Sequence, residues 1–124
     1  MSGPEKPKDI TQRTFQFALA TVRLCQRTEH DSGVWRVLGR QLLRSGTSVG
    51  ANVEEAQAGQ SKADFISKYA IALKEARETI YWLRLLKESG SVKDGSVELL
   101  IQEADELSRI IGSIIVSAKG GKSR

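Results

Sequence analysis

Apolar residues recur along the chain at intervals of three and four in four separate segments, the spacing that places them on one face of a helix. The period is most regular from Val97 to Ile115. The segment from Phe65 to Leu86 keeps the same period without a glycine or proline. Both prolines, at positions 4 and 7, precede the first segment. This pattern predicts an all-α protein.

Turn and capping residues set the expected bounds of the first two helices. Asp9 is the expected N-cap of the first helix, which should end near His30 because Asp-Ser-Gly at 31–33 favours a turn. The second helix is then expected over about residues 34–56.

The third helix is expected over about residues 62–88. Ser61 and Asp64 have the spacing of a capping box at its start, and Gly90 ends it. The candidate N-caps of the fourth helix are Asp94 and Ser96.

Four helices of about 33 Å with short links predict an antiparallel up-and-down four-helix bundle. With 124 residues the chain is expected to form one domain. We expect a flexible N-terminal arm at 1–8, the bundle at 9–118 and a flexible basic tail at 119–124.

Two features predict unusual contacts. The first helix has two apolar stripes, formed by Ile10, Phe17 and Leu24 and by Phe15, Leu19, Val22 and Cys25. The second stripe is either buried deep in its own bundle or meets another subunit. The second helix has Gly39, Gly46 and Gly50 on one face. Because glycine costs a helix about 1 kcal/mol relative to alanine, these positions predict a close-contact seam against the next helix or a neighbouring subunit.

Catalytic and metal-binding patterns are missing from the sequence. With one histidine, His30, and one cysteine, Cys25, no zinc site can be assembled, and no glutamate has the Glu-x-x-His spacing of a di-iron bundle. His30 is expected at a helix end and Cys25 in the core. We therefore expect neither an enzyme nor a cofactor. The single cysteine and the absence of an apolar leader or span favour a cytoplasmic protein that does not insert into a membrane.

Charge is distributed unevenly. Residues 94–118 have one basic and five acidic residues, whereas residues 61–93 have seven basic and four acidic residues. The candidates for contacts with a nucleic-acid backbone are Arg36, Arg40 and Arg44 on the second helix and Lys74, Arg77, Tyr81 and Arg84 on the third. The alternative is a solvated surface with salt bridges, in which Arg77 and Arg84 pair with acids of the fourth helix such as Glu103 or Glu106.

Polar and small residues cluster at the end of the second helix and continue into the third. The run at 45–56 resembles the Ser-x-x-Ser-Ile-x-x-Asn-Ile-x-Glu-Gly core of a bacterial family, the four-helix bundle proteins also called 23S rRNA intervening-sequence proteins. Ser-Lys-Ala-Asp-Phe-Ile at 61–66 and the run at 72–79 extend the resemblance, which covers about residues 9–118. Ala56 departs from the pattern, where many members have glycine. The motif and interface candidates are Gly39, Ser45, Gly46, Ser48, Gly50, Asn52, Glu55 and Glu78.

The resemblance implies a ring-like homopentamer without catalytic residues. Relatives include accessory proteins of diversity-generating retroelements, which bind nucleic acid and a reverse transcriptase. The first hypothesis is therefore an oligomeric module that binds RNA, DNA or a nucleic-acid-processing protein. The second is a structural or protein-interaction bundle, and the third, which the missing His/Cys cluster disfavours, is a small-molecule or metal enzyme. The polar motif residues either join the second and third helices or bind a ligand.

Overall fold

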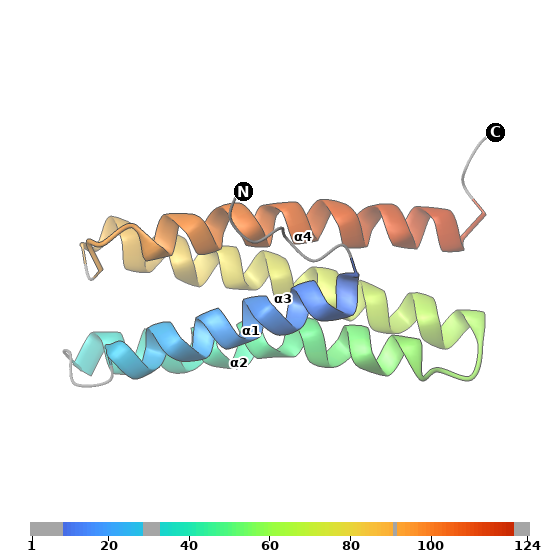
Figure 1. The fold of residues 1–124 in the computed structure, drawn as a ribbon, viewed down its shortest axis with the longest axis horizontal. Helices are drawn as coiled ribbons and strands as arrows, with labels where there is room; N and C mark the ends of the chain where they lie inside the picture. Colours follow the sequence, from blue (N-terminus) through green and yellow to red (C-terminus); the bar gives the residue numbers. More distant parts are fainter. Residues whose placement is uncertain (1–8, 29–32, 91, 121–124) are drawn as a thin grey trace, which may run out of the picture.

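The computed structural model describes residues 9–28, 33–90 and 92–120. Within these ranges the chain forms α1 (Ile10–Arg27), α2 (Gly33–Gln57), α3 (Lys62–Glu88) and α4 (Ser96–Ala118). Consecutive helices run in opposite directions and pack side by side, and a smaller contact between α1 and α4 closes the bundle (Figure 1). The predicted all-α four-helix bundle is confirmed. The expected arm at 1–8 and residues 121–124 of the expected tail lie outside the described residues.

Two of the predicted helix starts and one helix end are present in the structure. The Asp9 carboxylate accepts a hydrogen bond from the Thr11 amide at 3.1 Å, and the Ser61 hydroxyl accepts one from the Asp64 amide at 3.1 Å. Each bond satisfies an amide that has no partner within its own helix. α3 ends before Gly90, which adopts a φ of +73°, a conformation that glycine reaches without a steric penalty.

The end of α1 differs from the prediction. α1 ends at Arg27 rather than near His30, and Thr28 follows as its C-cap. The Thr28 hydroxyl donates to the Leu24 carbonyl oxygen at 2.8 Å, so a side chain satisfies one of the last carbonyls of the helix. His30 itself lies outside the described residues.

The start of α4 also differs from the prediction, which named Asp94 or Ser96 as the N-cap. The N-cap position is Gly95, with a φ of +85° and no side-chain cap. Asp94 acts from one residue further out, where its carboxylate accepts from the Ser96 hydroxyl at 2.7 Å and from the Ser96 amide at 3.0 Å. These hydrogen bonds lower the pKa of the Asp94 carboxyl.

The core consists of two apolar clusters with a polar layer between them. One cluster is built around Leu42, Leu83 and Leu107, and the other around Val49 and Ala76. Between them along α2 and α3 lie Ser45 and Thr79, both fully buried. The Thr79 hydroxyl donates to the Ser45 hydroxyl at 2.9 Å, and the Ser45 hydroxyl donates to the Leu42 carbonyl oxygen at 3.4 Å. The buried hydroxyls are therefore satisfied, as a polar group inside a core requires.

The glycine seam lies between α2 and α1. A β-carbon on Gly46 would lie 2.9 Å from Thr21 Cγ2, and one on Gly50 would lie 3.2 Å from the Thr14 carbonyl oxygen. The sequence predicted a seam against the next helix or a neighbouring subunit. For these two glycines the predicted partner was wrong, because the structure places the preceding helix, α1, against them. Gly39 has a different role, because a β-carbon there would lie 3.2 Å from the Trp35 ring of the same helix. Gly39 thus leaves room for the indole.

Candidate nucleic-acid interface

Arg44 joins α2 to α3 and is neutralised by two carboxylates. Its guanidinium forms an ion pair with Glu75 at 3.2 Å and a second ion pair with Glu78. Glu78 also accepts a hydrogen bond from the Trp82 indole N–H at 2.9 Å. Because both acids belong to the bundle itself, the charge of Arg44 is already balanced within the protein.

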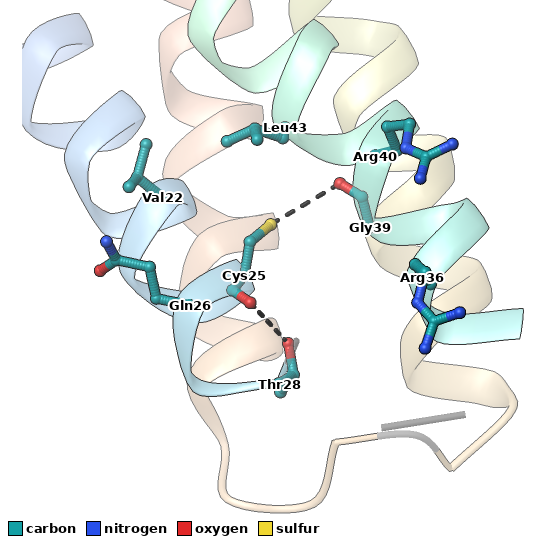
Figure 2. Close-up of a pocket in the computed structure, with 8 residues that line it drawn as sticks. All are labelled: Val22, Cys25, Gln26, Thr28, Arg36, Gly39, Arg40 and Leu43. Atoms are coloured by element: carbon teal, nitrogen blue, oxygen red, sulfur yellow. Dashed lines mark hydrogen bonds between the residues drawn. The ribbon is translucent and has the colours of Figure 1, made fainter. Parts of the chain in front are cut away.

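Arg36 and Arg40 lie on the other side of α2. They line an open groove of about 380 Å³ between α1 and α2, together with Val22, Cys25 and Leu43. Figure 2 shows both arginine side chains extending from α2 away from Cys25. Among the described residues, neither arginine forms an ion pair.

Cys25 is a packing residue at this groove. It is half-buried against the first core cluster, and its thiol donates to the Gly39 carbonyl oxygen at 3.6 Å (Figure 2). Burial raises the pKa of the Cys25 thiol. The thiol therefore stays protonated at neutral pH and is a poor nucleophile.

The basic candidates of α3 form one exposed row. Lys74, Arg77, Tyr81 and Arg84 are all exposed, and their spacing of three, four and three residues aligns them along the helix over about 15 Å. Within the part of the chain that the structure describes, the three cations form no ion pair. We call these four residues the α3 row. Tyr81 is 54% exposed, and its ring packs edge-on against Trp82, with 5.1 Å between the ring centroids.

The acids of α4 are engaged by α1. Arg13 binds Glu103 through two hydrogen bonds, of 2.8 and 3.0 Å, and also pairs with Glu106. The hydrogen bond with Glu103 raises the pKa of the Arg13 guanidinium, against the opposing effect of burial. The alternative that Arg77 and Arg84 pair with these acids is therefore wrong.

Arg13 was not among the residues singled out in the sequence. Its side chain is only 12% exposed. Its position, three residues after Ile10 and four before Phe17, places it beside the buried stripe of α1. A charged side chain at such a position needs a partner. An arginine beside the apolar stripe of α1 is therefore the sequence feature from which Arg13 could have been identified.

The polar motif residues are engaged in helix structure rather than gathered around a cavity. Ser45 bonds to Thr79 across the α2–α3 interface. The Ser48 hydroxyl donates to the Arg44 carbonyl oxygen at 2.7 Å, and the Asn52 amide donates to the Ser48 carbonyl oxygen at 2.9 Å. Glu55 is exposed on the surface of α2. These contacts favour the interpretation in which the motif joins and shapes helices.

The described part of the chain offers neither a metal site nor a membrane span. Among residues 9–28, 33–90 and 92–120, no three His, Cys, Asp or Glu side chains lie close enough together to hold a metal ion. None of the four described helices combines the length and the apolar character needed to cross a bilayer.

Comparisons with known proteins place the chain in a family. A family model described as "23S rRNA-intervening sequence protein" matches residues 6–113. A solved structure from Bacteroides thetaiotaomicron VPI-5482, described as a protein with unknown function from the S23 ribosomal protein family, is 38% identical in sequence. The match covers 86% of this chain and 98% of that chain, with a TM-score of 0.77. No match was found among curated proteins. The chain belongs to the 23S rRNA-intervening sequence protein family, as the resemblance of its motifs indicated.

Proposed function

We propose that this protein is a non-enzymatic, self-associating bundle that binds nucleic acid, or a protein partner that handles nucleic acid, through the α3 row. The observation that supports this function is the set of three exposed cations of the row, Lys74, Arg77 and Arg84, around an exposed tyrosine, with no ion pair to these cations among the described residues. Cations placed in this way neutralise phosphates and release counterions, which is the main source of sequence-independent affinity.

Several other arginines of the bundle already pair with carboxylates. Arg13 and Arg44 each pair with two carboxylates, and Arg109 pairs with Asp105. Arg36 and Arg40 form no ion pair with any described residue, but they line the groove between α1 and α2. They form a second basic site on a different side of the bundle.

Self-association is proposed through the apolar face of α1 and α2. Phe15 is 59% exposed and Leu43 is 36% exposed. Two hollows lie between these helices: one is lined by Arg40 and Leu43 among others, and the other by Phe15, Ala18 and Glu54 among others. Such a face suits contact with another copy of the chain, and the family resemblance implies five copies. Light scattering tests this part: a mass that stays near 13.6 kDa would contradict it.

The binding part is tested with fragments of ribosomal RNA at two salt concentrations. The triple variant Lys74→Gln, Arg77→Gln, Arg84→Gln is expected to lower the affinity and to flatten its dependence on salt. Each lost phosphate contact reduces the slope of log affinity against log salt by about 0.7 on single strands and about 0.9 on a DNA duplex. The double variant Arg36→Gln, Arg40→Gln is the matched control, because it removes exposed positive charge from another side of the bundle.

The second candidate function is a protein-interaction bundle without a nucleic-acid role. The exposed apolar face with Phe15 and Leu43 favours this alternative. If the wild-type protein shows no salt-dependent binding to RNA or DNA while it still associates, the second function is the better description.

A further inference from the structure

Tyr81 is presented to solvent on a rigid support. Its ring is more than half exposed and packs edge-on against Trp82, with ring planes inclined by 72°. The Trp82 indole is held by its hydrogen bond to Glu78, and Glu78 is held in turn by Arg44 of α2. The tyrosine is therefore oriented by a chain of contacts that joins α2 and α3. The Tyr81 ring does not fill the core.

The cations of the row lie on both sides of this ring along the helix. Arg77 precedes Tyr81 by one helical turn, and Arg84 follows it by about one turn. Lys74 extends the row by a further turn. A polynucleotide that follows the row can place phosphates on the cations while one base reaches the ring.

A duplex cannot use this arrangement in full. Its bases are stacked inside the double helix, so the outer surface of a protein helix meets only phosphates, sugars and groove edges. The bases of a single strand are free to stack on an aromatic side chain, and each such stack contributes about 1–3 kcal/mol with little sequence preference.

We infer that the α3 row binds single-stranded nucleic acid in preference to duplex, with the Tyr81 ring stacking on a base and Lys74, Arg77 and Arg84 contacting the phosphates beside it. This inference rests on the proposed function and specifies its ligand. The chemistry is shared by RNA and DNA, because both have stacking bases and a phosphate backbone.

The test compares four probes by fluorescence anisotropy at fixed salt: oligouridylate, oligodeoxythymidylate, a mixed-sequence duplex of the same length, and an abasic deoxyribose-phosphate strand. We expect the wild-type protein to bind the two single strands more tightly than the duplex or the abasic strand. Similar affinity for the uridylate and thymidylate strands is expected if the protein does not contact the 2′-hydroxyl. A preference for one strand would identify the natural ligand as RNA or as DNA.

Tyr81→Ala is expected to weaken binding of the base-containing single strands by about five- to hundredfold, which corresponds to the loss of one stack. Tyr81→Phe retains the ring and should restore most of that affinity. On the abasic strand Tyr81→Ala should have no effect, because the partner of the ring has already been removed. Val116→Ala, which truncates an apolar side chain that is 55% exposed on α4, is the matched control and should bind like the wild type.

Two results would overturn the inference while leaving the proposed function intact. One is equal binding of duplex and single strand, and the other is a Tyr81→Ala variant whose affinity is unchanged or falls equally for all four probes. Equal binding of the probes or an unchanged affinity of the variant would indicate a purely electrostatic surface, and an equal fall for all probes would indicate that the ring only supports the structure of the row. The absence of binding to every probe by the wild-type protein contradicts the proposed nucleic-acid function itself, so the two failures are distinguishable.

Discussion

Gly46 of α2 lies directly against Thr21 of α1, at a point where even one added carbon would come within 2.9 Å of the threonine methyl group. Thr21 is fully buried, and its hydroxyl donates to the Phe17 carbonyl oxygen of its own helix at 2.9 Å. The threonine is therefore held by its own helix and has little freedom to move aside. The close approach of α1 and α2 depends on this pair.

Gly46→Leu is expected to destabilise the fold by about 1–3 kcal/mol, because the side chain overpacks the seam. Chemical denaturation gives the free energy of unfolding. The matched control is Gly112→Ala on α4, where an added carbon meets nothing within 4 Å. That change should raise stability by up to about 1 kcal/mol, since alanine is the better helix former. Equal effects of the two substitutions would contradict a tight seam at Gly46.

The buried hydroxyl pair Ser45–Thr79 is expected to behave as a coupled unit. Thr79→Val removes the donor and leaves the Ser45 hydroxyl oxygen without that hydrogen bond, at a cost of about 1–3 kcal/mol. The double variant Ser45→Ala, Thr79→Val should lose less than the sum of the two single variants, because neither partner is left unsatisfied. Additive losses in the denaturation free energies would show that the two hydroxyls do not interact.

Arg13→Met is expected to destabilise the bundle through the loss of the link between α1 and α4. The Glu103 side chain is only 21% exposed and would lose both of its hydrogen bonds to the guanidinium. Thermal unfolding should show a lower Tm. Arg109→Met is the control, because its pair with Asp105 lies within one exposed helix face and such pairs contribute about 0.3–0.5 kcal/mol.

Cys25 is expected to react slowly with thiol reagents in the native protein. Burial raises the pKa of the thiol, so the reactive thiolate is scarcer at neutral pH than in an ordinary cysteine. The labelling rate should increase with pH and should rise sharply when the chain is unfolded in denaturant. The measured labelling rate belongs to Cys25 alone, because the sequence has a single cysteine. A native rate equal to the denatured rate would contradict the packed position of this side chain.

The helices could be predicted from the sequence because local signals determine them. The apolar period defines each helix face, and Ser61 and Gly90 mark the ends of α3 through the same chemistry that the structure shows. The capping of α4 was harder to predict, because Asp94 acts from outside the N-cap position and Gly95 occupies it.

The candidate site could be predicted only in part, because the pairing of charges depends on the rotation of helices. Arg36, Arg40 and Arg44 are each four residues apart, and four residues exceed one helical turn by about 40°. Over the eight residues from Arg36 to Arg44 the direction changes by about 80°, which moves the side chain from the α1 side to the α3 side. The residues of the α3 row span a similar length, and within the described ranges none of the three cations pairs with an acid, so the row remains exposed.

The polar layer at the middle of the core has a consequence for how the helices align. Leucine and valine surfaces tolerate sliding, because one apolar contact replaces another at similar free energy. A shift of α3 along α2 by one turn, about 5.4 Å, would separate Ser45 from Thr79 and bury both hydroxyls among apolar side chains. Each hydroxyl would keep its hydrogen bond to a carbonyl oxygen of its own helix, Leu42 for Ser45 and Glu75 for Thr79, and would lose the bond that crosses to the other helix. This buried hydrogen bond and the ion pairs of Arg44 with Glu75 and Glu78 therefore favour one register of two long helices, and with it one position of the exposed cations on α3 relative to α2.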